Sequence, residues 1–380
     1  MQTKLSEEQK LLQMTVRQVS AEVVAPIAKE IDESGEFPKE VFAKAAEIGL
    51  AGIAIPEEYG GSGMDTVSYC VAIEEVSRHC ATSGVILSVN NSLVCDPLLE
   101  FGSEAQKKTY LRPLASGEKL GCFALTEPGA GSDAGSLRTT ARRDGDDYVL
   151  DGSKVFITNG TDADYALVFA TVDPALKHRG ITAFIVATDS PGFSRGGKEY
   201  KLGVNGSGTT ELAFTNMRVP AAQRIGNDGE GFKIAMRTLD GGRIGIAAQA
   251  IGIARGAFEE ALEYSKDREQ FGKPLAHFQA IQFYLADMAT ELDAARFLTW
   301  KAAWIKDTKG RCTLEAAQAK LFASEAAQRI TNKALQIHGG YGYTREYNVE
   351  RYFRDARITE IYEGTSEIQK MVIAGAVLAD

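Results

Sequence analysis

The spacing of apolar residues changes its period twice along this chain, and this change limits the folds that the chain can adopt. From residue 6 to about residue 117 apolar side chains recur at helical spacing, as in PKEVFAKAAEIGL (38–50). Between about 121 and 225 the pattern becomes short β-rich runs, and after Gly231 the helical period returns. We therefore expect an α+β multidomain protein with an N-terminal α-helical domain (1–120), a middle β-barrel or sheet domain (121–225) and a C-terminal domain like a four-helix bundle (226–380).

Local patterns refine this expectation. Four runs are typical of strands, namely DYVLDGSKVFITNG, YALVFATVD, GITAFIVAT and TTELAFTNMRVP, and Asp151-Gly152 in the first is a hairpin signal. A long helix of the last domain is predicted by five apolar residues on one face: Ile281, Leu285, Met288, Leu292 and Ala295. The segment 243–258 is apolar nearly all round, which indicates a helix buried on several sides, with a subunit interface as one way to cover it.

Composition and charge exclude several classes of protein. Hydrophobic residues make up 44% and charged residues 24% of the 380 residues, without the long apolar runs of a membrane protein. A formal net charge of -9 argues against nucleic-acid binding. Ser6 and Gln9 have capping-box spacing and follow no export signal, and the five cysteines form no Cys-x-x-Cys pair. We expect a bacterial cytoplasmic protein with reduced thiols, and leave open a mature mitochondrial form.

Common catalytic motifs are missing from the sequence. The four histidines are scattered without metal-ligand spacing, so we expect no metal site. Neither a G-x-S-x-G elbow nor a Walker loop occurs, which argues against an α/β-hydrolase and a P-loop enzyme. The run GAGSDAG (129–135) fails as a dinucleotide fingerprint, because its third glycine is one place late and no strand precedes it; by composition it reads as a turn.

Five separated stretches, taken together, resemble the acyl-CoA dehydrogenase family, and they occur in the family's order. They are CFALTEPGAGSDAG (122–135), FITN (156–159), LDGGRIGIAAQAIGIA (239–254), REQFGKPLAHFQ (268–279) and the C-terminal pair LQIHGGYGY and ITEIYEGTSEIQ. Within the family the sequence is most similar to short-chain, butyryl-CoA members. The resemblance implies the three-domain fold, FAD at the junction of the middle and last domains, and a homotetramer built as a dimer of dimers.

The resemblance assigns Glu363 as the base that removes the α-proton of an acyl-CoA thioester, while FAD accepts the hydride from Cβ. Taken alone, Glu363 would be read as a solvated surface charge. Burial would raise its pKa toward that of the activated proton. Gly364 would let the substrate approach the backbone, although a glycine after a helix is more often a cap. Some relatives carry the base near the position of Gly242, which cannot serve here.

The resemblance also assigns cofactor contacts. The ring of FAD would contact a group of middle-domain residues: Phe123, Leu125, Thr126, Phe156, Ile157 and Thr158, with Ser132 nearby. The FAD of a neighbouring subunit would be reached by residues of the last domain: Arg268, Phe271, Gln279, Gln336, Gly339 and Gly340. Thr365 and Glu367 would lie near its adenosine part. Without the resemblance these residues would be read as strand packing, solvated helix charges and a helix terminus.

For the substrate, the resemblance implies contacts from Ser132, Asp240, Arg243 and Gly364. Asn205 and Gly208 depart from the short-chain pattern, which puts coenzyme A contacts from their loop in doubt. Gln249 is a polar residue in an apolar helix and so requires a hydrogen-bond partner. It either floors the acyl pocket or forms a structural bond between helices.

Several functions are compatible with these residues. The leading hypothesis is an FAD-dependent dehydrogenase of a short-chain acyl-CoA that forms the trans-2-enoyl-CoA and passes electrons to an electron-transferring flavoprotein. A dehydrogenase for branched, cyclic or dicarboxylic acyl-CoA stays open, because pocket walls are poorly read from sequence. An acyl-CoA oxidase is disfavoured by the chain's length, and a non-catalytic coenzyme A-binding scaffold by the presence of Glu363.

Overall fold

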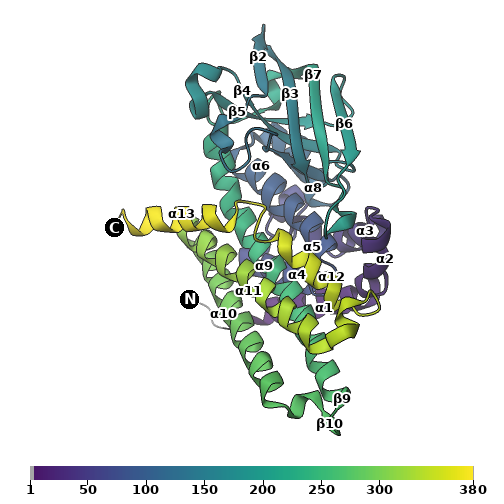
Figure 1. Ribbon diagram of the computed structural model, residues 1–380. Helices are drawn as coiled ribbons and strands as arrows, with labels where there is room; N and C mark the ends of the chain where they lie inside the picture. Colours follow the sequence, from purple (N-terminus) through teal and green to yellow (C-terminus); the bar gives the residue numbers. More distant parts are fainter. Residues whose placement is uncertain (1–3, 380) are drawn as a thin grey trace.

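The structure, a computed structural model, describes residues 4–379, and its sheet lies at one end of the molecule while the two sets of helices pack together at the other (Figure 1). The helices of the first part are α1 (Glu7–Val19), α2 (Ala28–Ser34), α3 (Lys39–Glu47), α4 (Thr66–Ser77), α5 (Ala81–Ser88), α6 (Asp96–Phe101), α7 (Glu104–Gln106) and α8 (Arg112–Ala115). A π-helical segment, η5 (Val89–Cys95), continues α5. The capping box predicted at Ser6 and Gln9 is present and begins α1.

The middle part is a sheet. Its strands are β1 (Gly121–Ala124), β2 (Thr140–Asp144), β3 (Asp147–Ile157), β4 (Tyr165–Thr171), β5 (Ile181–Ala187), β6 (Phe193–Lys198), β7 (Thr210–Pro220) and β8 (Arg224–Ile225). Within the described residues the strand order is β6-β7-β3-β2-β4-β5-β8, and β1 pairs with β4 in parallel. All four runs predicted as strands form strands.

The turn predicted at Asp151-Gly152 is wrong. β3 continues through both residues, and the β2–β3 hairpin turns instead at Gly145, which has φ 64°. At Gly152 the register with β7 shifts and φ is 144°. A Cβ there would lie 2.7 Å from the Cα of Thr139, so this glycine allows two backbones to approach closely at a bulge.

The last part returns to helices. They are α9 (Gly231–Asp267), α10 (Gln279–Lys309), α11 (Thr313–His338), α12 (Val349–Ile358) and α13 (Ser366–Val377). A short hairpin of β9 (Glu269–Gln270) and β10 (Lys273–Pro274) joins α9 to α10 at the end of the bundle remote from the sheet (Figure 1). The predicted face of α10 is confirmed, because Met288, Leu292 and Ala295 are buried.

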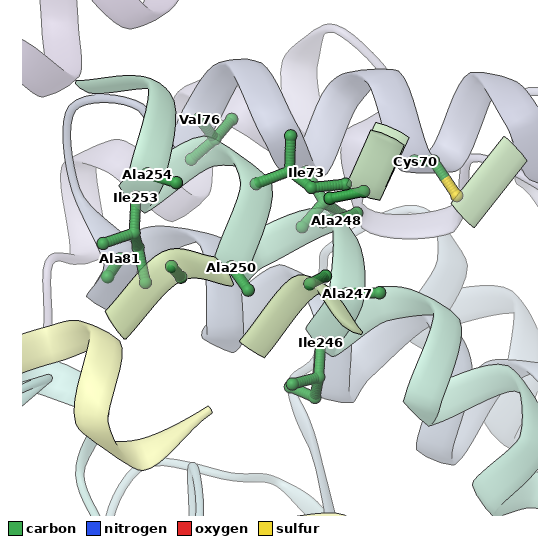
Figure 2. Packing of buried hydrophobic residues seen from close by; sticks show 14 of the residues in the cluster. Cys70, Ile73, Val76, Ala81, Ile246, Ala247, Ala248, Ala250, Ile253 and Ala254 are labelled. Carbon is green, nitrogen blue, oxygen red and sulfur yellow. The ribbon is translucent and has the colours of Figure 1, made fainter. Parts of the chain in front are cut away.

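The centre of the molecule is α9, as the apolar stretch predicted. Every residue from Asp240 to Ala254 is buried, and the chain's own helices α4, α5, α10 and α11 pack around it. Figure 2 shows Ala248 and Ala254 of α9 beside Ile73 and Val76 of α4. The helix is therefore covered within one chain and does not need a subunit interface to bury it.

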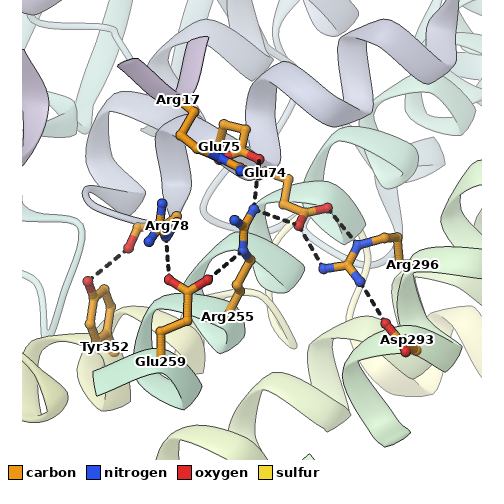
Figure 3. Close-up of polar contacts among 9 residues, drawn as sticks. All are labelled: Arg17, Glu74, Glu75, Arg78, Arg255, Glu259, Asp293, Arg296 and Tyr352. Carbon is orange, nitrogen blue, oxygen red and sulfur yellow. Dashed lines mark hydrogen bonds and ion pairs between the residues drawn. The ribbon is translucent and has the colours of Figure 1, made fainter. Parts of the chain in front are cut away.

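A buried ionic network joins the two helical parts (Figure 3). Arg255 of α9 lies 2.8 Å from Glu75 and 3.3 Å from Glu74, both on α4. Arg17 of α1 contacts Glu75 at 2.9 Å, and Arg296 of α10 contacts Glu74 at 2.8 Å. Burial works to raise the pKa of Glu75, but the hydrogen bond from Arg17 and the charge of Arg255 outweigh it and lower the pKa.

Two further structural findings bear on the expected classes. The five cysteines are free and buried. Among residues 4–379, no helix combines the length and the apolar character needed to cross a bilayer.

Close packing around α9 yields a stability prediction. A Cβ at Gly252 would lie 2.5 Å from the carbonyl oxygen of Glu74 and 2.6 Å from the Cβ of Ser77. Gly252→Ala should therefore lower the free energy of unfolding by about 1–3 kcal/mol, despite the better helix propensity of alanine. Denaturant unfolding measures this change.

The matched control is Gly375→Ala in exposed α13, where a Cβ would meet nothing within 4 Å. It should leave stability unchanged or raise it by up to about 1 kcal/mol. Equal effects of both substitutions would contradict the packing argument.

Candidate active site

A cleft opens where the sheet meets α9 and the loop between α12 and α13. It holds a cavity of about 180 Å³ inside a wider open space of about 930 Å³. The lining residues include apolar side chains of the first helical part: Val85, Val89 and Leu93. Other walls come from the ends of β1 and β3, from α9 and from the α12–α13 loop.

Glu363 lies in this loop in a backbone conformation unusual for a residue with a side chain. Its φ is 52°, and Gly364 follows with φ 91°. A non-glycine residue in the left-handed region costs on the order of 1–3 kcal/mol and persists only where neighbouring contacts hold it. Here Gln369 Nε2 donates to the carbonyl oxygens of Glu363 (3.1 Å) and Gly364 (2.8 Å), and Lys320 Nζ donates to Gly364 O at 2.7 Å.

The Glu363 carboxylate points toward α9. Its Oε2 atom is buried and has no hydrogen-bond partner among the described residues. A Cβ at Gly242 would overlap this atom, so the glycine makes room for the carboxylate. Burial raises the pKa of Glu363 to about 8, against the opposing charges of Lys320 and Arg243.

A second buried charge faces the cleft from α9. Arg243 donates through Nη1 to Asp240 Oδ1 at 2.8 Å, and Thr313 Oγ1 donates to the other carboxylate oxygen at 2.7 Å. The Nε of Arg243 has no partner among the described residues. The arginine therefore has an unpaired buried donor in the cleft, and its charge acts on Glu363.

A buried ion pair lies behind the cleft wall that Leu125, Thr126 and Phe156 form, and its lysine also donates to Leu125 O at 3.1 Å. Lys154 of β3 is fully buried and contacts Glu127 at 2.7 Å, while Glu127 also accepts from the backbone N–H groups of Arg138 (2.6 Å) and Thr139 (2.9 Å). Burial lowers the pKa of Lys154 to about 8, although Glu127 opposes this effect. The pair fixes the loop 127–139 against β3.

The wall beside this pair has room for a flat aromatic ligand. Phe156 has φ 57° in an irregular end of β3 and is 65% exposed, with its side chain lining the cleft. A Cβ on Gly131, another lining residue, would meet nothing within 4 Å. The hydroxyls of Thr126 and Thr158 lie on the same wall. An exposed ring, open space and nearby hydroxyls suit a planar ring with a polar edge, as in a flavin.

The cleft brings together many of the predicted site residues. Those that line it are Phe123, Leu125, Thr126, Ser132, Phe156, Ile157, Thr158, Arg243, Glu363 and Gly364. Asp240 lies directly behind Arg243, as described above. Thr365 caps the start of α13, accepting from Ile368 N at 3.4 Å, and exposed Glu367 follows in the first turn. Both adjoin the α12–α13 loop that carries Glu363.

Six predicted residues lie at the other end of the bundle. They are Arg268, Phe271, Gln279, Gln336, Gly339 and Gly340, and all are exposed. They gather where α9 ends, α10 begins and α11 ends, with the Arg268 guanidinium 5.5 Å from the Tyr341 ring. Arg243 and Arg268 are 25 residues apart along α9, which corresponds to roughly 37 Å. Within one chain, the residues that line the cleft and the six residues near Arg268 are therefore too far apart to contact the same part of one bound ligand.

Gln249 lies behind the cleft. Its Nε2 donates to Ala81 O at 2.9 Å, and its Oε1 accepts from the Tyr362 hydroxyl. The glutamine thus joins α9 to α5 and supports Tyr362, which does line the cleft. The predicted bond between helices is present, whereas Gln249 is not among the residues that line the cleft, so its role as the floor of the acyl pocket stays a prediction.

The departing residues Asn205 and Gly208 lie outside the cleft. Asn205 Nδ2 donates to Asp32 Oδ1 of α2 at 2.8 Å, and Gly208 has φ 54°. Their loop therefore contacts the first helical part.

Sequence reasoning missed two polar residues of this site, Lys320 and Tyr362. Lys320 occupies the buried face of α11 with Ala316, Ala323 and Ala327, so its place in the apolar period was the available signal. Tyr362 precedes Glu363 within the recognised motif. In the described part of the chain, no group of three or more His, Cys, Asp or Glu residues could hold a metal ion.

Comparison with known proteins matches three family models in succession. They are the N-terminal domain (residues 6–118), middle domain (122–217) and C-terminal domain (229–378) of acyl-CoA dehydrogenase. The chain is 52% identical over 373 residues to the short-chain specific acyl-CoA dehydrogenase of Clostridium acetobutylicum, covering 98% of both chains.

Two solved structures are similar over the whole chain. One is butyryl-CoA dehydrogenase from Megasphaera elsdenii, with 48% identity, a TM-score of 0.97 and 100% of both chains covered. The other is a chain in a structure of the electron transferring flavoprotein of Acidaminococcus fermentans, also 48% identical, with a TM-score of 0.99 and 100% of both chains covered.

The Lys154–Glu127 pair yields a prediction for the cleft wall. Lys154→Met leaves the Glu127 carboxylate buried without its cation, so the free energy of unfolding should fall by about 3–5 kcal/mol. The double variant Lys154→Met/Glu127→Gln removes both charges and should recover at least half of that loss. Denaturant unfolding measures both.

The control is Lys108→Met at an exposed lysine, which should change stability by less than about 0.5 kcal/mol. A single variant as stable as the original protein would show that the pair does not hold the wall.

Proposed function

Because this chain belongs to the acyl-CoA dehydrogenase family, we propose that it oxidises a short-chain acyl-CoA of about the size of butyryl-CoA to the trans-2-enoyl-CoA. The observation that carries this proposal is the Glu363 carboxylate, whose buried Oε2 lacks a partner in a cleft with apolar walls. The names of the relatives, short-chain specific and butyryl-CoA dehydrogenase, support the size of the substrate.

Glu363 is proposed as the base that takes the α-proton. Its raised pKa makes it a far stronger proton acceptor than a carboxylate in water. The backbone N–H of Glu363 has no acceptor among the described residues, so it is free to donate to the thioester oxygen as negative charge develops there. Arg243 holds positive charge nearby, and Ser132 and Gly364 border the space for the thioester and its arm.

FAD is the cofactor of this family, and the residues of the cleft fit it. When bound, FAD accepts the hydride that leaves Cβ. The exposed ring of Phe156, the open space beside Gly131 and the hydroxyls of Thr126 and Thr158 are the features of this chain that would hold its ring. The ion pair of Lys154 and Glu127 would keep that wall in place.

The proposal includes partners. An electron-transferring flavoprotein is the proposed electron acceptor, which agrees with the similarity to the chain from Acidaminococcus fermentans. A homotetramer, a dimer of dimers, is proposed because Arg268, Phe271 and the residues around them are exposed and remote from their own cleft. Under this assembly they would contact the FAD of a neighbour. A cytoplasmic location is proposed on the strength of the five free thiols.

The catalytic assignment predicts the behaviour of Glu363→Gln. This variant should bind FAD and acyl-CoA but lose the anaerobic bleaching of the yellow flavin colour by about 10²–10⁴-fold or more in rate, because glutamine cannot accept the proton. Stopped-flow absorbance measures the rate. The matched control is Glu7→Gln, at an exposed carboxylate of α1 outside the cleft, which should keep the full activity. Normal bleaching by Glu363→Gln would reject the assignment.

The same assay ranks substrates. Butyryl-CoA should bleach the protein faster than octanoyl-CoA or a branched acyl-CoA. Recovery of colour with an electron-transferring flavoprotein but slowly in air would identify a dehydrogenase and exclude an oxidase. A protein that binds no flavin, or bleaches with no acyl-CoA, would contradict the proposed function.

The raised pKa of Glu363 predicts a pH dependence. Only the carboxylate can accept a proton, so kcat/KM should rise as pH increases and level off above about 8. The value of kcat/KM falls at lower pH because protonation of Glu363 removes the carboxylate that accepts the α-proton. Measurement of kcat/KM for butyryl-CoA from pH 6 to pH 9 tests this, and a flat profile would contradict it.

A further inference from the structure

Two fully buried donors hold the backbone around Glu363. Lys320 of α11 and Gln369 of α13 both have 0% exposure. Lys320 Nζ lies 2.7 Å from Gly364 O, and Gln369 Nε2 lies 2.8 Å from the same oxygen and 3.1 Å from Glu363 O. The two side chains arrive from different helices, so the left-handed turn is fixed from two directions.

A buried lysine at position 320 is energetically unfavourable if its only role is to donate a hydrogen bond to the backbone. Burying an ammonium group without an ion pair is unfavourable by several kcal/mol, and a neutral amide could hold a carbonyl at less cost. Lys320 forms no ion pair within 4.0 Å among the described residues, because its hydrogen-bond partner is a neutral carbonyl. Its charge is therefore compensated over a longer distance, and the carboxylate of Glu363 is the strongest opposite charge acting on it.

We propose that Lys320 and Gln369 are positioning residues for Glu363: together they hold the Glu363–Gly364 turn in its left-handed conformation, and the charge of Lys320 stabilises the ionised carboxylate. This inference rests on the proposed function, since it gives Glu363 the role of base. It separates two tasks. Gln369 acts on geometry alone, whereas Lys320 acts on both geometry and charge.

The other charged groups around the pair leave Lys320 as the main compensating charge. Arg243 of α9 also acts on Glu363 but is engaged by Asp240 at 2.8 Å. Glu367 of α13 and Glu325 of α11 act on Lys320 from outside, and the neutral tyrosines Tyr69 of α4 and Tyr362 face Glu363. Burial lowers the pKa of Lys320, the ionised carboxylate of Glu363 is the largest charge that opposes this shift, and each of the two charges therefore favours the other.

The test reads the titration of Glu363 directly. Infrared difference spectra of the FAD-bound protein record the bands of protonated carboxyl groups as pH rises. The band that is absent from the Glu363→Gln variant is assigned to Glu363, and the pH at which half of this band is lost is the midpoint for Glu363. Lys320→Met removes the charge, so the midpoint should move upward by about one pH unit or more. Gln369→Leu should leave the midpoint within a few tenths of a unit but slow bleaching by butyryl-CoA about tenfold.

Two further variants keep the test decisive. Lys306→Met removes another largely buried lysine, which pairs with Asp96 at 2.8 Å, and should lower stability without moving the Glu363 midpoint. If Lys320→Met does not fold, Lys320→Gln supplies a neutral donor of similar size and should raise the midpoint in the same direction. Lys320→Arg, which keeps the charge, should retain the original midpoint.

The outcomes distinguish this inference from the proposed function. An unchanged midpoint in Lys320→Met and Lys320→Gln, with a parent protein that bleaches normally, overturns the charge role of Lys320 alone. A Gln369→Leu variant that bleaches at the parent rate overturns its positioning role. A parent protein that does not bleach with any acyl-CoA overturns the proposed function, while the infrared midpoints still report on Lys320.

Discussion

The burial of α9 on all sides is the constraint on which the rest of the structure depends. A helix of 37 residues that is apolar through its middle must be covered by other elements, and here both helical parts and the edge of the sheet supply the cover. Glycines along α9 let these elements approach. Gly252 receives the backbone of α4, and Gly242 leaves the space that the Glu363 carboxylate fills. One helix thus determines both the packing of the core and the position of the proposed base.

Buried carboxylates in this protein behave in opposite ways because their partners differ. Glu75 and Glu127 are enclosed by cations and N–H donors, which lower their pKa despite burial. Glu363 is desolvated with no hydrogen bond to Oε2 among the described residues, and burial raises its pKa. The first two stabilise contacts between elements. The third is the proposed proton acceptor, and its burial lowers stability by an amount that the surrounding structure must offset.

Much of the fold follows from the sequence by periodicity, as the buried face of α10 and the enclosed middle of α9 demonstrate. The turn predicted at Asp151-Gly152 is wrong because the glycine has another role. Gly152 allows the backbone of β3 to approach Thr139 closely, and packing between strands decided its conformation rather than the local turn signal. The cleft was predictable through its motif, which carried Glu363 and the residues around Phe156. Lys320 escaped notice because a lysine alone is expected on the surface, and only its apolar neighbours on α11 indicate burial.

Because α9 is long, a substitution in one copy of the chain can impair the cleft of another copy in the proposed tetramer. Arg268 stands about 37 Å along the helix from Arg243 and its cleft. In the proposed tetramer a substitution at Arg268 would leave its own chain's cleft intact and impair that of a neighbour. Two differently damaged chains, one altered at Arg268 and one at Glu363, could then form mixed assemblies in which some clefts contain only undamaged parts. Inheritance of such defects would follow rules of complementation between alleles.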